Sequence, residues 1–260
     1  PGIVIRFRPG TYETTGISLG PRWWVVGAGM EQTTLRRVPG DRDRRYYRTG
    51  FAVIGGGWGP QQDRGLDGAP FPERKYEDLR VADLTLDANW PGIREALGPW
   101  AKKASGLSVV CRQIEVARVR VVRFGAVGGR FEWREVFPIS VTSSFTSAEG
   151  FRGYPDPDIE IHGCEIIGPV LGPEQNREWP YCTGIVVGNR DARPEEGGVR
   201  VRVHHNLFRD IENGIGFGGA YMRGGVFEQN EVLRCGLGFN FDTGGCAGVI
   251  IRDNRIIDCV

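Results

Sequence analysis

Three segments near the end of the chain repeat one another: VRVHHNLF (201–208), GVFEQNEV (225–232) and VIIRDNRI (249–256). Their asparagines, Asn206, Asn230 and Asn254, are spaced 24 and 24 residues apart. A fixed period in this range is typical of a solenoid, in which each repeat forms one coil. Each segment consists of two very short apolar strands that break at the asparagine, and both are far too short for helices.

The composition fits a turn-rich, all-β protein. The chain has 260 residues, 40% of them hydrophobic and 25% charged, with 40 glycines that follow no collagen-like period. A net charge of +1 argues against nucleic acid or a membrane surface as the main partner. No run of about 18 apolar residues exists, so we expect no membrane insertion.

Six cysteines fit no zinc-binding spacing. Cys235 and Cys259 are again 24 residues apart, which predicts that they lie one above the other in successive turns. We interpret the cysteines as buried thiols, with an occasional disulfide as the alternative.

From residue 50 onward a second pattern appears, of short apolar–x–apolar strands that mostly follow a glycine. Between them lie the partners of the Asn-type segments, so each coil has three strands whose alternate residues point inward. Stacking the coils buries the inward rows as one continuous core, which no single coil forms alone. The glycine-opened strands are at 51–53, 107–109, 139–141, 185–187, 215–217 and 239–241.

The opening stretch, residues 1–38, carries the strand Ile3/Ile5/Phe7, the turn PGTY (9–12) and the turn GAG (27–29). It resembles the N-terminal coils of the pectate-lyase-like superfamily, and the resemblance extends over almost the whole chain. That resemblance implies a right-handed parallel β-helix with three sheets, of about seven coils here. We predict one domain over 1–260, with 1–38 as its N-terminal coil or cap region. Because Val260 follows a strand directly, we expect further coils or a partner chain to cover the last one.

Two polar rows are interpreted as scaffold. Asn206, Asn230 and Asn254 are predicted to share one corner and to hydrogen-bond as a ladder, with Cys164 at the same corner one coil earlier. His162 and His204 occupy equivalent outward positions, with Glu228 and Arg252 following in the same row. We interpret this row as a solvated polar stripe, with a metal-binding histidine pair as the alternative.

Residues in excess of the 24-residue period fall just before or after the glycine-opened strands, and they predict loops that wall a groove along one face. Flat aromatic side chains in these loops suit the apolar faces of sugar rings. An equal alternative is that they only pin their loops to the solenoid. The loops are 55–78, 88–106, 123–137, 143–158, 168–183 and 189–198, with Trp58, Trp90, Trp100, Trp133, Tyr154, Trp179 and Tyr181; Trp58, Trp133, Trp179 and Tyr181 are our candidates for ligand contact.

The predicted groove floor is the outward row of the glycine-opened strands, including Ser108/Val110, Ser140/Thr142, Val186/Gly188 and Asn240/Asp242. Asp242 is its one carboxylate and our first catalytic candidate, with Asn240 beside it as a substrate-binding residue. Hydrolysis of a glycosidic bond usually needs two carboxyl groups, about 5 Å or 6.5–9.5 Å apart. Glu212, Asp210 and Asp191 are candidates for the second acid, although a solvated or turn-capping role is the alternative for each.

A lyase or epimerase would instead need a base and cations that hold the charge formed next to a carboxylate. Arg190 is our candidate for such a cation. Asp156 and Asp158 are candidate ligands for Ca²⁺, which many relatives of the superfamily bind. The superfamily's hydrolase branch carries Asn-Thr-Asp, Asp-Asp and Gly-His-Gly along this face, and their absence here disfavours a pectin hydrolase.

The sequence therefore predicts a carbohydrate-active enzyme, a lyase, hydrolase or epimerase, that binds an extended polysaccharide along the looped face. The alternative is a non-catalytic polysaccharide-binding or adhesive β-solenoid, such as a surface or tailspike-like module. The resemblance also implies an extracellular or periplasmic location.

Overall fold

The structure is a computed structural model of the chain. It describes residues 2–40, 50–55, 76–98, 101, 103–126, 136–147, 150–168, 182–189, 192–211, 215–220, 222–243 and 245–259. At 50–55, 126, 144–147, 150–152, 215–220 and 241–243 it describes the backbone alone.

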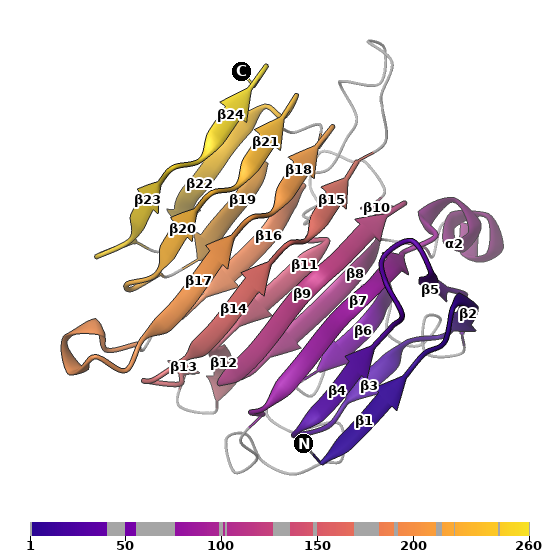
Figure 1. The fold of residues 1–260 in the computed structure, drawn as a ribbon, viewed down its shortest axis with the longest axis horizontal. Coiled ribbons are helices and arrows are strands. Elements are labelled where there is room, and N and C mark those ends of the chain that lie inside the picture. The colour runs from indigo at the N-terminus through magenta and orange to yellow at the C-terminus, as the bar shows by residue number, and fades with distance from the viewer. Residues whose placement is uncertain are drawn as a thin grey trace.

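The described strands form a right-handed parallel β-helix, as predicted, with strands stacked from the N-terminal to the C-terminal end (Figure 1). One bent, 14-stranded sheet supplies two faces. Its first face consists of β1 (Ile3–Arg6), β4 (Trp23–Val26), the first halves of β7 (Leu79–Asp87) and β9 (Gln113–Val122), β14 (Asp158–His162), β17 (Arg200–His204), β20 (Val226–Glu228) and β23 (Ile250–Arg252). Its second face consists of β2 (Gly10–Thr14), β5 (Thr33–Arg37), the second halves of β7 and β9, β15 (Glu165–Ile167), β18 (Leu207–Arg209), β21 (Glu231–Leu233) and β24 (Arg255–Ile257).

The third face is a separate sheet, and it contains the glycine-opened strands of the sequence pattern. Its parallel strands are β3 (Ile17–Leu19), β6 (Gly50–Gly55), β8 (Lys103–Val110), β11 (Ile139–Thr142), β16 (Thr183–Gly188), β19 (Ile215–Ala220) and β22 (Leu237–Thr243), with β10 (Gly125–Ala126) antiparallel to β8. The described residues thus form seven three-strand coils and two strands of an eighth.

A row of left-handed residues makes the corner between the first and second faces. From the coil of β7 onward, one residue at this corner of each described coil has a φ between 50° and 62°: Asp83, Arg118, Gly163, His205, Gln229 and Asp253. A single residue in this conformation turns the chain sharply between two short strands, which is why the strands break there.

In the last three coils, the residue after this corner is an asparagine, and the three form the predicted ladder. Asn206 Nδ2 donates to Asn230 Oδ1 (3.0 Å), and Asn230 Nδ2 donates to Asn254 Oδ1 (2.9 Å). The same oxygens accept from the backbone N–H of Asn206 and Asn230. Cys164 N–H donates to Asn206 Oδ1 (2.9 Å), so Cys164 lies at this corner one coil earlier, as expected. The ladder satisfies backbone groups that the broken strands leave unpaired.

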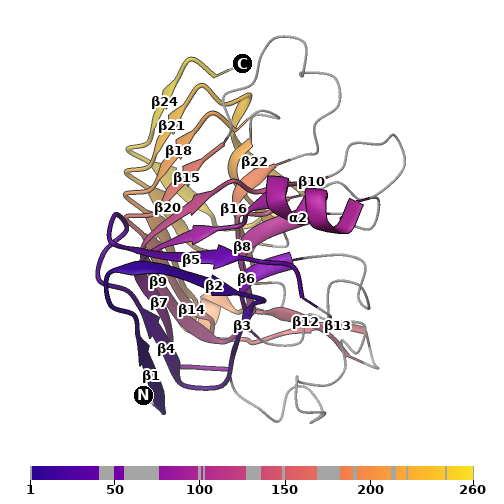
Figure 2. The ribbon, with the colours of Figure 1, turned by 90° about the vertical axis from the view of Figure 1, so that its right-hand side faces the viewer.

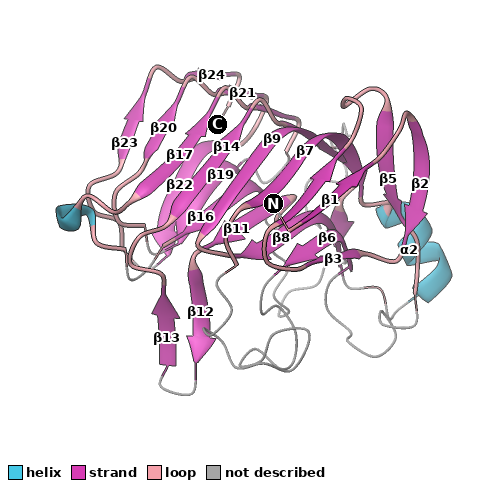
Figure 3. Ribbon diagram, turned by 60° about the horizontal axis from the view of Figure 1, so that its bottom comes forward, coloured by secondary structure: helices cyan, strands magenta, loops and turns pink. Residues whose placement is uncertain are grey.

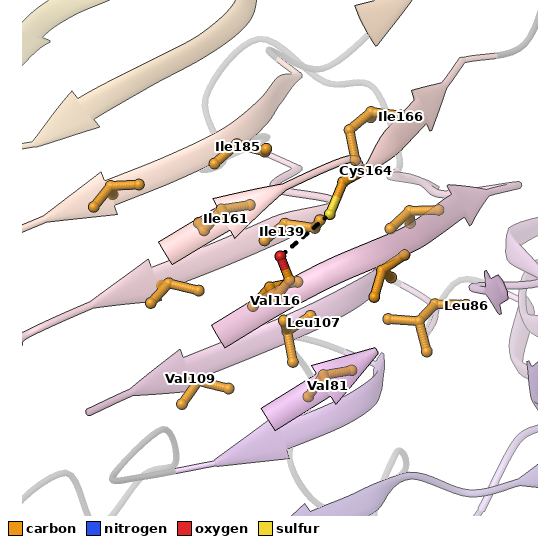
Figure 4. Close-up of a cluster of buried hydrophobic side chains, with 14 of the residues drawn as sticks. Val81, Leu86, Leu107, Val109, Val116, Ile139, Ile161, Cys164, Ile166 and Ile185 are labelled. Atoms are coloured by element: carbon orange, nitrogen blue, oxygen red, sulfur yellow. Dashed lines mark hydrogen bonds between the residues drawn. The ribbon is translucent and has the colours of Figure 1, made fainter. Parts of the chain in front are cut away.

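The core fills the space between the three faces with stacked aliphatic rows. Figure 4 shows Val81 and Val116, Leu107 and Ile139 in such rows; all four are fully buried. Cys164 lies among them and its thiol contacts Val116 O at 3.6 Å. At about 25 cal/mol per Å² of apolar surface, these rows supply the main stabilisation of the solenoid.

Four predicted loops contain secondary structure that the sequence reading missed, among them 123–137 with β10. Helix α2 (Trp90–Leu97) lies within 88–106, the antiparallel hairpin of β12 (Ser144–Ser147) and β13 (Gly150–Gly153) lies within 143–158, and the 3₁₀ turn η2 (Pro194–Glu196) lies within 189–198. Figure 3 shows α2 and the hairpin outside the stacked coils. The buried residues of α2, Trp90, Ile93 and Leu97, recur at helical spacing, a signal too short to detect beside the dominant β pattern. No helix among the described residues is long and apolar enough to cross a membrane.

Candidate functional site

The described excursions from the coils lie on the side of the third face. Figure 2 shows α2, β10 and the β12–β13 hairpin projecting to the side where β8, β16 and β22 lie. Trp90 and Tyr154, two aromatic residues of these excursions, are only 8% and 7% exposed. Both therefore pin their segments to the solenoid, and neither is available to a ligand.

The predicted floor of the third face is in register but is open only in part. Ser108 pairs with Ser140, Ser140 with Val186, and Gly218 with Asn240, as the outward row requires. Ser108 and Ser140 are nevertheless buried, at 0% and 3% exposure. An open floor at β8 and β11 is thus a wrong prediction, because chain outside the coils, such as α2 against β8, packs on this part of the sheet.

Further along the third face the outward positions reach solvent. Val186 on β16 and Asn240 on β22 are half-buried, and Gly218 on β19 lies in the same row. We call Val186, Gly218 and Asn240 the open strip. Its residues are small or uncharged, and the strip runs across three successive coils.

The open strip ends at a β-bulge that includes Asp242. Gly218 pairs with Asn240, but Ala220 pairs with Thr243, so β22 has one residue more than β19 over this interval. Bulges interrupt the alternation of side chains and often lie beside active sites. The strict alternation by which we placed Asp242 on the outward face therefore does not hold across the bulge, and the side chain of Asp242 lies outside the described part of the structure.

Asp210, a candidate for the second acid, is held in an ion pair. Its φ of 56° places it in a left-handed turn after β18. Arg234 of the next coil donates to both carboxylate oxygens, with Nε–Oδ1 2.6 Å and Nη2–Oδ2 2.7 Å, and Arg209 Nε lies 3.4 Å from Oδ2. This arrangement suits a corner ion pair; a catalytic role for Asp210 stays a prediction.

The other candidate residues lie outside the described part of the chain. They are Glu212, Asp191 and Arg190 among the catalytic candidates, and Trp58, Trp133, Trp179 and Tyr181 among the ligand-binding candidates.

The two candidate calcium ligands are both bound to arginines. Asp156 takes two hydrogen bonds from Arg112, at 3.0 and 2.5 Å, and Asp158 accepts from Arg200 at 2.6 Å. A guanidinium at each carboxylate disfavours a divalent cation at the same oxygens. Among the described residues no cluster of three or more His, Cys, Asp or Glu side chains is arranged to hold a metal ion.

The histidine row on the first face is a ladder of stacked rings, each with a carboxylate. The His162 and His204 rings stack with centroids 5.2 Å apart and planes 5° apart. His162 Nε2 lies 3.2 Å from Glu115 Oε1, and His204 Nε2 lies 3.0 Å from Glu160 Oε1. Each carboxylate comes from the preceding coil, and sequence reasoning missed these partners. The signal was available, because the Glu of Glu160–Ile161–His162 aligns with Glu115 in the coil before.

Electrostatics across this row stabilise neutral histidine and ionised glutamate. Burial lowers the pKa of His204, partly opposed by its hydrogen bond with Glu160. That hydrogen bond in turn lowers the pKa of Glu160. Glu228, next in the row after His204, accepts from Arg202 and Arg252, and these bonds lower its pKa. The charges on the first face therefore neutralise one another between coils.

The third face differs from the other two. Its described strand side chains include no carboxylate, whereas the first and second faces are crossed by Arg–Glu pairs such as Arg80–Glu115 and Arg120–Glu165. Among the described residues, the open strip therefore lacks the Arg–Glu pairs that cross the other two faces.

Comparison with known proteins assigns neither a family nor an activity. No family model and no curated protein matches the sequence. Among solved structures, the chain is similar to the A-module of the mannuronan C-5 epimerase AlgE6 of Azotobacter vinelandii, with 13% identity and a TM-score of 0.34 over 98% of this chain and 66% of that one. It is also similar to PfbA, a surface adhesin of Streptococcus pneumoniae, with 10% identity and a TM-score of 0.35 over 98% and 84%. The chain thus spans about two thirds of the epimerase module.

Proposed function

We propose that this chain belongs to the pectate-lyase-like superfamily and is an extracellular or periplasmic carbohydrate-active enzyme whose polysaccharide substrate lies along the open strip. The observation that supports this most is the strip itself, Val186, Gly218 and Asn240. A row that advances about 4.8 Å per coil and carries small, uncharged side chains fits an extended polymer laid across successive coils.

The chemistry is proposed to lie at the bulge end of the strip. Asp242 acts as the acid or base, Asn240 binds a sugar hydroxyl, and Glu212, Asp210 or Asp191 supplies the second carboxylate that hydrolysis requires. In a lyase or an epimerase, Asp242 instead removes the proton next to the sugar carboxylate, and Arg190 stabilises the charge that develops. Trp58, Trp133, Trp179 and Tyr181 are proposed to stack on sugar rings from the flanking loops.

A non-catalytic, adhesive β-solenoid is the second candidate. One observation favours it: both carboxylate oxygens of Asp210 are bound by Arg234, so the one described candidate for the second acid is engaged in the scaffold. A binding module needs the strip and the aromatic loops but no pair of acids.

The test is an assay of the purified chain against a panel of neutral and uronic-acid polysaccharides. New reducing ends report hydrolysis, ultraviolet absorbance reports unsaturated lyase products, and proton NMR of the polymer reports epimerisation. Binding to one polysaccharide without any product would overturn the enzyme and support the adhesive alternative.

The catalytic residue is tested by Asp242→Asn, with Asp253→Asn as the matched control. Asp253 is an exposed acid at the corner between the first two faces, away from the strip. We expect Asp242→Asn to lower kcat by on the order of 10²–10⁴-fold while substrate still binds, and the control to retain full activity.

A further inference from the structure

Cys235 and Cys259 occupy the same position in the last two coils. The strands that precede them pair in register, Leu233 with Ile257, and the backbone N–H of Cys235 contacts Cys259 Sγ at 3.4 Å. Each thiol also makes the same local contact, to the carbonyl oxygen two residues earlier, at 3.3 Å in both cases. The two side chains are therefore stacked with the same local contact, although Cys235 is the more buried.

This stacking falls within the geometric range of a disulfide. Neighbouring parallel strands are about 4.8 Å apart, and disulfide-bonded cysteines have Cα atoms about 4.4–6.8 Å apart. Both thiols are reduced in the structure. The spacing of adjacent coils therefore allows a bond between the two sulfurs.

The coil that Cys259 ends has more exposed apolar side chains than the coil before it. Phe227 and Val232 are fully buried, but their register partners in that coil, Ile251 and Ile256, are 47% and 49% exposed. Local opening free energies are smallest where few apolar contacts are made. A covalent bond between these two coils would hold the more exposed coil to the buried one.

We infer that Cys235 and Cys259 form a reversible disulfide that joins the last two coils under oxidising conditions. The inference does not depend on the proposed activity. It needs only the reduced pair and a small-molecule disulfide, such as oxidised glutathione, as oxidant.

The reaction proceeds by two thiol–disulfide exchanges. The thiolate of Cys259, the more exposed of the two, attacks one sulfur of oxidised glutathione and displaces one glutathione thiolate. The thiolate of Cys235 then attacks Cys259 Sγ and displaces the second. The two cysteine protons pass through water to the two glutathione thiolates, so one disulfide is reduced and one is formed. Burial raises the pKa of Cys235 to about 11, which makes Cys259 the first to react.

The test uses the whole chain carrying Cys246→Ser, because Cys246 is exposed and shares a tryptic peptide with Cys235. The protein is incubated with oxidised glutathione, its remaining thiols are alkylated, and it is digested with trypsin without reduction. We expect mass spectrometry to find peptide 235–252 linked to the peptide that begins at Ile256. We also expect amide exchange over 250–257 to slow by roughly 100-fold, and dithiothreitol to reverse this.

Cys235→Ser is the matched control. Here Cys259 has no resolving thiol, so we expect it to retain one glutathione and amide exchange over 250–257 to stay fast. Recovery of Cys235 and Cys259 as alkylated thiols after oxidation of the parent chain would overturn the inference. A persistent glutathione adduct on Cys259 with Cys235 alkylated, or a linked peptide without slower exchange, would overturn it equally.

Discussion

Replacement of Asn230 by leucine tests whether the asparagine ladder stabilises the solenoid as its geometry implies. Asn230 is 1% exposed and makes four hydrogen bonds. It donates to Val203 O and Asn254 Oδ1, and accepts from Asn206 N–H and Asn206 Nδ2. Leucine has nearly the same shape and none of these groups, so Asn230→Leu leaves the buried backbone N–H of Asn206 without its acceptor and removes one hydrogen bond from Val203 C=O.

A buried backbone N–H left unpaired costs about 1–3 kcal/mol, so the expected loss is about 1–3 kcal/mol. That is a measurable part of the roughly 5–15 kcal/mol that stabilises a typical domain. Urea unfolding followed by circular dichroism measures it as a lower midpoint with an unchanged slope. Asn254→Leu is the graded control. Asn254 is on the last described coil, where water can replace the lost bonds, so this variant should lose less than half as much free energy of unfolding as Asn230→Leu. A loss below about 1 kcal/mol for Asn230→Leu, or equal losses for both variants, would refute the reasoning.

Three further predictions concern the core, a corner and the histidine ladder. Phe208→Ala removes a fully buried ring and should cost about 3–5 kcal/mol in urea unfolding, whereas Ile256→Ala, half-exposed, should cost less than about 1 kcal/mol. Gly168→Ala should destabilise strongly or prevent folding, measured by the yield of folded protein and its Tm, because a Cβ there would lie 2.0 Å from Asp210 O. Burial lowers the pKa of His204, so the unfolded chain takes up a proton that the folded chain resists. The contribution of His204 to the free energy of unfolding should therefore be fully present above about pH 6.5 and should fall as the pH drops below that value. In His204→Gln, the urea midpoint should change less with pH over this range.

Most of the scaffold could be predicted because the same structural environment recurs in every coil. A parallel β-helix places equivalent residues at each coil, so any requirement of the core or a corner recurs in the sequence at the coil length. Asn206, Asn230 and Asn254 report this register directly, and the same register places Cys235 against Cys259. The asparagine ladder, the stacking of Cys235 on Cys259 and that of His162 on His204 are confirmed.

The excursions could not be predicted in the same way, because each occurs once and no other coil repeats it. Helix α2 carries its apolar spacing over only eight residues, too few to outweigh the surrounding strand pattern. Strand alternation predicts on which side of the sheet Ser108 and Ser140 lie. It does not predict whether other parts of the chain cover that side. The bulge after Asn240 likewise depends on the pairing of two particular strands.

The distribution of charge gives an independent reason to look for function on the third face. Stacked coils bring equivalent positions to about 4.8 Å, so like charges in one row repel unless a neighbouring row supplies the opposite sign. Glu115 and Glu160 are such like-charged neighbours, and His162, His204 and Arg80 provide their partners. On the first face these polar side chains therefore compensate the repulsion between stacked like charges. The open strip, Val186, Gly218 and Asn240, carries no charged side chain, so no such repulsion arises there. The third face is therefore where the proposed ligand site at Asn240 and Asp242 should be tested first.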